Sequence, residues 1–322
     1  MIIVLVFFLG TIFGTVLNNQ KSSTITPRPK EIQSIITFSK LGQKGRLGNQ
    51  LFEIATVIAV AEDNNCKVIL PKNKCQFYDL CDVPYDIVNM RGYKTIPIYE
   101  TDNYEDILIP KDGRLYDIIG YRQSYRYFNK HGDKIRHLLK PKQEIIDRVR
   151  NKLNDLGIDQ YIGLHIRFTD SGSDKLISKM YNYFVNSLKF INQSLGKKLK
   201  VVVCTDQPSK VNLNKIPNGI ISPFDNSIDD FVALYLSDHL IMSISTLSWM
   251  AGWLGDQSRI IIMPTPWWDP NSMPGKLYHL TGSELEIPEW HVMSLDGQLT
   301  KHQQINKNKP LDFYRFLRYL FI

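Results

Sequence analysis

Two nitrogen-bearing side chains at the end of an apolar run are the first residues in this sequence that could do chemistry. Residues 161–167 (YIGLHIR) have the composition of a buried strand, and His165 and Arg167 lie near its end. Because alternate side chains of a strand share a face, both would point the same way. Ligands of open α/β sheets bind outside the carboxyl ends of the strands, and two such donors suit a diphosphate. A His and an Arg that pair with acids at a sheet edge are the alternative.

A glycine-rich loop before a helical pattern is the second candidate. Residues 41–50 (LGQKGRLGNQ) contain three glycines, the last of them Gly48. Glycines let the backbone approach a ligand, and the free N–H groups of the following helix attract an anion. Arg46 would add a guanidinium, and Asn49 an amide at the helix start. The loop lacks the G-K-[ST] of a P-loop and a regular G-x-G-x-x-G, so a simple tight turn is the alternative.

A run of hydroxyl side chains at residues 243–248 (SISTLS) is the third candidate. It follows a strand pattern and opens a short helix, so Ser245, Thr246 and Ser248 could surround an anion at the helix N-terminus. Ordinary N-capping of the helix is the alternative, and we expect at least one of these residues to cap.

The three segments share one chemical logic, because each offers hydrogen-bond donors at a strand-to-helix or strand-to-loop junction. A diphosphate that leaves during a reaction needs its developing negative charge stabilised. Enzymes often use a metal held by acidic residues, but the sequence has no D-x-D triplet. The acidic pair Asp229 and Asp230 is typical of the first turn of a helix instead. We therefore expect stabilisation by arginine and backbone dipoles, with no metal and no metal ligands.

The elements that must position these residues alternate between strands and helices. The patterns predict strands at 34–39, 67–70, 161–167, 200–204, 239–244 and 259–263. They predict helices at 51–65, 179–192, 228–237 and 247–254, a charged helix within 136–157, and a helix packed on the body at 300–322. Residues 71–135 have no clear pattern. This alternation indicates an α/β fold whose parallel sheets are covered on both faces. We expect an N-terminal domain at 34–150 and a C-terminal domain at 151–322.

The composition of the sequence limits the classes of protein to which it could belong. The 322 residues carry a formal charge of +7 and are 43% apolar, which is ordinary for a globular protein. The basic residues are scattered, so nucleic acid is not an expected partner. Cys75 and Cys81 are close enough in sequence to form a disulfide, and Cys66 could pair with either. Cys204 lies in an apolar run and is expected to be a buried thiol. No C-x-x-C occurs, so zinc is not expected.

The N-terminus predicts a membrane anchor. Residues 1–17 carry no charge and just reach the length of a membrane span, and residues 18–33 read as a flexible stem. A cleaved signal peptide is the alternative, but the basic n-region and a clear cleavage site are missing. Lys21, Arg28 and Lys30 follow the apolar run, and the positive-inside rule would place that side in the cytoplasm. This conflicts with the luminal placement given below.

The motifs resemble those of the α-1,2-fucosyltransferases, which form glycosyltransferase family 11, and are similar to those of protein O-fucosyltransferases. Four segments carry the resemblance over roughly residues 36–268, in matching order and spacing. They are GRLGNQLF at 45–52, HIRFTD at 165–170, the strand end VCTDQ at 203–207, and ISTLSWMAGWL at 244–254. Each motif alone is unspecific, whereas the combination is specific.

The resemblance implies a GT-B-like fold with two Rossmann-like halves. It also implies inverting, metal-independent transfer of fucose from GDP-fucose to a glycan acceptor, with no cofactor besides this donor substrate. The product implied is that of a galactoside 2-α-fucosyltransferase. The protein would be a single-pass type II protein of the Golgi membrane with a luminal catalytic domain.

Residue roles follow from the same resemblance. Arg167 would hold the β-phosphate, and His165 and Asp170 would shape the site. The remaining donor-binding residues would be Arg46, Gly48, Asn49, Asp206, Ser245, Thr246 and Ser248.

Departures from the family pattern leave alternatives open. The family's second arginine is Phe168 here, its asparagine is Ile244, and its second tryptophan is Met250. Losing a cation at the phosphate site would weaken donor binding. A catalytically impaired glycan- or nucleotide-binding protein is therefore one alternative, and a transferase that uses another nucleotide sugar is a second.

Two further features bear on the acceptor and on topology. Trp267 and Trp268 are candidates for stacking on an acceptor sugar, although packing in the core is the favoured interpretation. Asn192 begins an N-Q-S glycosylation sequon, which would be used only in the lumen.

Overall fold

The computed structural model describes residues 32–301, apart from residue 44 and residues 102–103, 170–173 and 268–282. The expected anchor at 1–17 and nearly all of the stem lie outside these residues. The helix expected at 300–322 does so too, except for its first two residues, which belong to a strand. Within the described ranges, no helix is long and apolar enough to span a membrane.

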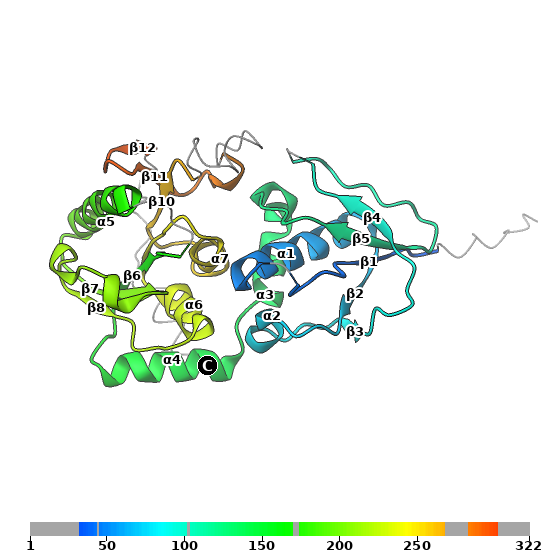
Figure 1. Cartoon of the computed structure of the whole chain (residues 1–322), viewed down its shortest axis with the longest axis horizontal. Coiled ribbons are helices and arrows are strands. Elements are labelled where there is room, and N and C mark those ends of the chain that lie inside the picture. Colours follow the sequence, from blue (N-terminus) through cyan, green and yellow to red (C-terminus); the bar gives the residue numbers. More distant parts are fainter. Residues whose placement is uncertain (1–31, 44, 102–103, 170–173, 268–282, 302–322) are drawn as a thin grey trace, which may run out of the picture. The chain divides into compact units, whose positions relative to one another are not determined.

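The first sheet is parallel throughout and has the strand order β3-β2-β1-β5-β4. Its strands are β1 (Ile35–Thr37), β2 (Lys67–Pro71), β3 (Asp86–Val88), β4 (Ile96–Tyr99) and β5 (Leu115–Ile119). The long helix α1 (Leu47–Asn64) connects β1 to β2 and packs on them, as Figure 1 shows in blue. Fourteen of its fifteen residues from Leu47 to Ala61 are buried, Asn49 being the exception, so this helix forms the centre of the first core.

Shorter helices complete this part of the chain. They are α2 (Gln76–Leu80), α3 (Gly132–Leu138) and two 3₁₀ turns, η1 (Tyr125–Tyr127) and η2 (Asn129–His131). Helix α4 (Gln143–Asp155) then leads to the second sheet. It buries Ile145, Val149 and Leu153, which recur at helical spacing, while its other side is charged.

The second sheet has the order β12-β11-β10-β9-β6-β7-β8. Its strands are β6 (Tyr161–Ile166), β7 (Lys200–Thr205), β8 (Gly219–Ile221), β9 (His239–Ile241), β10 (Ile261–Thr265), β11 (His291–Ser294) and β12 (Leu299–Lys301). Only β12 is antiparallel to its neighbour among these strands. Numbered along the chain, the six parallel strands follow the order 3-2-1-4-5-6 of the dinucleotide-binding Rossmann fold. The chain reverses direction across the sheet between β6 and β9.

Helices cover both faces of this sheet, as expected for a buried parallel sheet. The helices are α5 (Asp174–Leu195), α6 (Ser227–Leu236) and α7 (Thr246–Leu254), with the 3₁₀ turns η3 (Pro208–Lys210), η4 (Leu213–Lys215) and η5 (Ser283–Leu285). Alternate residues of β7 enter different apolar clusters. Val202 and Cys204 join the cluster that contains α6, whereas Val201 and Val203 join the cluster that contains α5. The expected α/β class with parallel sheets is thus confirmed.

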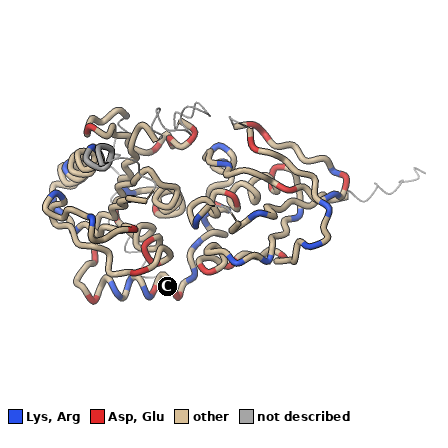
Figure 2. The backbone as a smooth tube through the Cα atoms, in the orientation of Figure 1, with Lys and Arg blue, Asp and Glu red and all other residues tan. Residues whose placement is uncertain are grey.

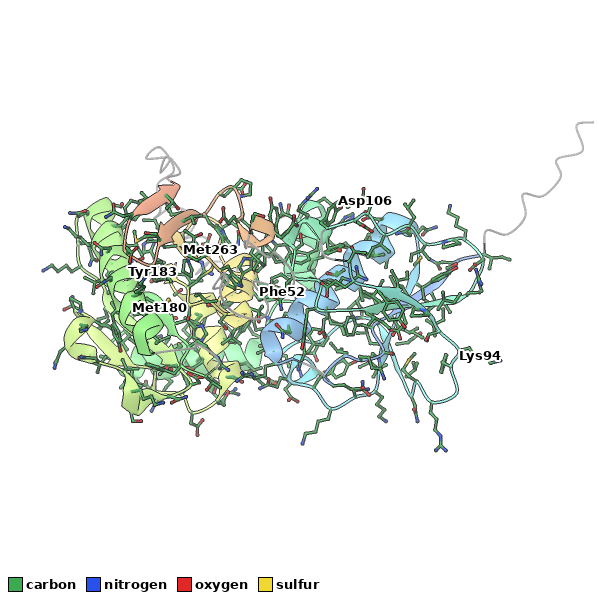
Figure 3. All side chains as sticks on the ribbon, turned by 45° about the horizontal axis from the view of Figure 1, so that its top comes forward. Phe52, Lys94, Asp106, Met180, Tyr183 and Met263 are labelled. Atoms are coloured by element: carbon green, nitrogen blue, oxygen red, sulfur yellow. The ribbon has the colours of Figure 1, made fainter. Side chains whose placement is uncertain are left out.

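Helices α1 and α7 pack against each other, so residues of both sheets share one core cluster. Phe52 of α1, labelled in Figure 3, lies 4.7 Å from Trp249 of α7 between ring centroids. Phe128 completes the aromatic group, with its ring centroid 5.6 Å from that of Phe52. This packing fixes the N-terminal turn of α1 close to the N-terminal turn of α7.

Neither the charged side chains nor the cysteines are concentrated on one element. Lys and Arg alternate with Asp and Glu along the chain in Figure 2, in agreement with the scattered charges of the sequence. All four cysteines are free thiols, so none of the three disulfides considered from the sequence is present. Cys75 and Cys81 flank α2 at its two ends, and Cys204 is a fully buried thiol as expected.

Candidate active site

The chain reversal in the second sheet defines where a ligand would bind. In open α/β sheets, ligands bind outside the carboxyl ends of the strands at the point where the strand order reverses. Here that point lies between β6 and β9, which pair directly. Arg167 follows the end of β6, and the segment 242–246 joins the end of β9 to α7. Two of the three motifs singled out from the sequence therefore meet at one place.

His165 lies in the wall beneath this place. Its side chain is only 3% exposed, and its Nδ1 lies 3.1 Å from the Ser248 hydroxyl. Burial, with a smaller effect of the nearby Arg167 charge, lowers the pKa of His165 to about 4. The imidazole is therefore neutral at physiological pH. It adds no positive charge, and its contact with Ser248 joins β6 to α7.

The depressed pKa of His165 predicts an acid-sensitive fold. The unfolded chain takes up this proton near pH 6.5 and the folded chain only near pH 4, so stability falls as the pH drops through that window. We expect His165→Asn to lose this part of the pH dependence, as measured by urea unfolding. His137 is exposed, so His137→Asn serves as the control that keeps the wild-type slope. An unchanged slope in His165→Asn would contradict the assignment.

Arg167 is held at the end of β6 by a carboxylate from the neighbouring strand. Its Nη1 lies 3.0 Å from Oδ2 of Asp206, which follows β7, and its Nε donates to the Thr169 carbonyl at 3.1 Å. The Arg167 side chain keeps 17% exposure. A cation that is positioned by protein contacts and still reaches solvent can bind an anion without reorganising.

Asp206 organises the loop after β6 as well as the arginine. It accepts hydrogen bonds from the backbone N–H groups of Phe168 at 2.9 Å and Thr169 at 3.0 Å. Burial would raise the pKa of Asp206, but these donors and Arg167 outweigh it and hold that pKa below its usual range. Asp206 is thus an ionised positioning residue for Arg167.

The three hydroxyl side chains at the start of α7 make different contacts. Ser245 is the N-cap and accepts from the Leu247 backbone N–H at 3.3 Å, so the expected capping is confirmed. Thr246 donates to Oδ1 of Asn49 at 2.8 Å. Ser248 is fully buried against His165, which differs from the expectation that its hydroxyl faces an anion. Ser243, which was not among the predicted site residues, accepts the Arg167 backbone N–H at 3.3 Å.

The glycine-rich loop brings α1 to the same place. Gly45 has φ = +73°, a conformation that favours glycine, and Arg46 is the exposed residue before α1. A Cβ at Gly48 would overlap the backbone of Thr246 and Leu247, so only glycine permits this approach of α1 to α7. Asn49 follows directly, and its Oδ1 accepts from Thr246.

Several predicted residues are not brought to this place. Asp170 and Trp268 lie outside the described residues. Trp267 is 2% exposed and packs in the core, in agreement with the favoured interpretation. Asn192 lies on α5, and its Oδ1 is buried. Among the described residues, no group of three or more His, Cys, Asp or Glu side chains is arranged to hold a metal ion.

One further residue near Asn49 has no recognisable signal in the sequence. Gln123 donates from Nε2 to Oδ1 of Asn49 at 3.2 Å. It lies in the loop after β5, within the stretch that had no clear pattern. Its role could not be found without knowing that β5 pairs with β1.

The chain belongs to glycosyl transferase family 11, whose model matches residues 8–280. A curated relative, the alpha-1,2-colitosyltransferase of Escherichia coli, is 22% identical over 268 residues. That match covers 70% of this chain and 90% of the relative.

Solved structures of two fucosyltransferases are also similar. The alpha-1,6-fucosyltransferase NodZ, soaked with GDP-fucose, has a TM-score of 0.46 at 13% identity, and the match covers 69% of this chain and 93% of NodZ. POFUT1 in complex with GDP has a TM-score of 0.46 at 11% identity, with 70% of this chain and 95% of POFUT1 covered.

Proposed function

We propose that this glycosyltransferase moves L-fucose from GDP-fucose to a sugar hydroxyl with inversion at the anomeric carbon, as a galactoside 2-α-fucosyltransferase. It would use neither a metal nor a cofactor. It would act in the Golgi lumen, tethered to the membrane by residues 1–17. Membership of family 11 supports sugar transfer. The observation that carries the donor site is Arg167, fixed by Asp206 where the second sheet reverses.

The geometry supports a leaving-group mechanism based on fixed donors. The acceptor hydroxyl attacks C1 of fucose from the face opposite GDP, through a transition state with oxocarbenium character. Arg167 and the backbone N–H groups at the start of α7 stabilise the negative charge that develops on the departing diphosphate. Arg46 and Asn49 approach from α1, and Asn49 is oriented by its contact with Thr246.

A second donor sugar follows from the curated relative. That protein is named as a colitosyltransferase, and colitose is fucose without the 3-hydroxyl group. A site that hydrogen-bonds the 3-hydroxyl group discriminates strongly against the deoxy sugar, whereas an apolar site does not. GDP-colitose is therefore the second donor to test.

The substitution of Phe168 for the family's second arginine motivates the alternative of an impaired protein. Phe168 is 8% exposed and packs in the apolar cluster around α5. Strand alternation places its side chain on the other face from Arg167. Donor binding at this site therefore depends on Arg167, and an impaired protein would bind GDP without turning it over.

Calorimetric titration of the full-length chain with GDP, GDP-fucose, GDP-colitose, UDP and ADP tests the proposal. We expect binding that is selective for guanine nucleotides and unchanged by EDTA. We also expect transfer of fucose to a galactoside acceptor, detected by mass spectrometry. Equal affinity for UDP and GDP, or loss of binding with EDTA, would contradict the proposed donor. GDP binding without transfer from either sugar donor would favour the impaired protein.

A further inference from the structure

A buried carboxyl group on α1 has no role in the donor site. Glu53 is 1% exposed, and its Oε2 has no hydrogen-bond partner in the described part of the chain. Burial, followed by the charge of Glu100, raises the pKa of Glu53 to about 9, so the group is protonated at neutral pH. Glu53 lies four residues after Asn49, and therefore on the same face of α1, one turn away.

Glu100 is the partner of Glu53 and follows β4 directly. Its carboxylate accepts hydrogen bonds from the backbone N–H groups of Tyr121, at 2.7 Å, and Arg122. A Cβ at Gly120 would overlap the Glu100 side chain, and Arg122 has the left-handed φ of +51°. The loop after β5 is therefore shaped around this carboxylate, and such unusual backbone conformations concentrate at functional sites.

The electrostatics of Glu100 suit a proton acceptor. The residue as a whole is exposed, while its two carboxyl oxygens accept the backbone N–H groups of Tyr121 and Arg122 and are partly desolvated by that loop. This desolvation raises the pKa of Glu100, although the backbone donors and the Arg122 charge partly oppose it. The negative charge of an ionised Glu100 in turn contributes to the raised pKa of Glu53.

The same loop is connected to the donor site. Gln123, three residues after Gly120, donates to Oδ1 of Asn49, and the same oxygen accepts from Thr246 at the start of α7. Two exposed aromatic residues adjoin these segments in the chain, Tyr99 at the end of β4 at 68% exposure and Tyr121 in the loop after β5 at 42%. Exposed aromatic rings suit the apolar face of a sugar. The loop after β5 is thus linked through Asn49 to the start of α7, which is part of the proposed donor site.

We propose that Glu100 is the general base of the transfer and removes the proton of the acceptor hydroxyl group, with the buried carboxyl group of Glu53 near it. This inference rests on the proposed function. The acceptor O–H bond breaks and its proton passes to the Glu100 carboxylate. The acceptor oxygen forms the new bond to C1 of the donor sugar. The bond from C1 to the phosphate oxygen breaks, and its electron pair leaves with GDP.

Kinetics of Glu100 variants in the full-length chain test this assignment. We expect Glu100→Gln to lower kcat by about 10²–10⁴-fold, the usual contribution of a general base, while the Kd for GDP stays unchanged. Glu100→Asp keeps a carboxylate and should recover part of the rate. Its acidic limb of kcat against pH should lie at lower pH than in the wild type, because aspartate is the stronger acid. Glu105 is an exposed acid near Glu100 in sequence, so Glu105→Gln is the matched control.

The outcomes separate this assignment from the proposed function. Unchanged GDP binding in Glu100→Gln shows that the variant is folded. If that variant transfers sugar at the wild-type rate, or if Glu100→Asp shows an unshifted acidic limb, Glu100 is not the base while the proposed function stands. If the wild type transfers no sugar from any GDP-linked donor, both proposals fail together.

Discussion

Arg167→Ala is expected to lower kcat with GDP-fucose by about 10²–10³-fold and to weaken GDP binding, because it removes the positioned cation from the donor site. The guanidinium is fixed by the carboxylate of Asp206 and the carbonyl of Thr169 before any ligand arrives. Little energy is then spent on ordering this side chain when charge develops on the diphosphate. Steady-state kinetics and calorimetry on the same preparation measure both effects.

Two further variants distinguish geometry from charge at Arg167. Lysine keeps the charge but cannot contact Asp206 and Thr169 through a planar guanidinium, so Arg167→Lys should remain well below the wild-type rate. Asp206→Asn should lose rate because the loop and Arg167 are less well positioned. Arg114 forms an exposed ion pair with Asp112, and Arg114→Ala is the control that keeps full activity. Normal turnover by Arg167→Ala would contradict the donor site.

The second half of the chain was predictable because its elements carry strong local patterns. The apolar runs at β6, β7 and β10 and the spacing of α6 each fix a local structure, and these elements appear close to their expected bounds. A parallel sheet buried on both faces requires such continuous apolar strands. Once the strands are known, the carboxyl ends of β6 and β9 lie together, and Arg167 comes close to the start of α7.

The first half was less predictable because its strands are short and carry weak patterns. β3 and β4 span only three and four residues, all of them exposed or half-buried, and β4 contains a proline, so neither has the pattern of a buried strand. Tertiary pairing selects them as strands, and sequence propensity does not. Glu100 and Gln123 lie after β4 and β5, and the contacts of Glu100 with the loop after β5 and of Gln123 with Asn49 depend on that pairing. In the sequence, Glu53 is an ordinary polar residue of a helical pattern. Its burial depends on how α1 packs in the fold, which the pattern does not show.

Gly48→Ala is expected to destabilise the fold and disrupt the donor site, although helix propensity alone predicts a more stable protein. Alanine is favoured over glycine within a helix by about 1 kcal/mol, so an isolated α1 would gain stability. In the fold, however, the added methyl group overlaps backbone atoms of Thr246 and Leu247, which cannot rotate away. Overpacking of this kind costs about 1–3 kcal/mol, so after the gain in helix propensity we expect a net loss of up to about 2 kcal/mol.

Gly132→Ala is the matched control for this prediction. Gly132 is also helical, with φ = −51° and ψ = −48°, but the atoms nearest to its new Cβ belong to the guanidinium of Arg136, which can shift at the cost of its hydrogen bond to the Trp253 carbonyl. That variant should lose less stability in urea unfolding than Gly48→Ala. In Gly48→Ala the methyl group separates α1 from α7 and moves Asn49 away from Thr246, so GDP-dependent turnover should fall along with stability. A stabilised and fully active Gly48→Ala would show that the close approach of the two helices is not required.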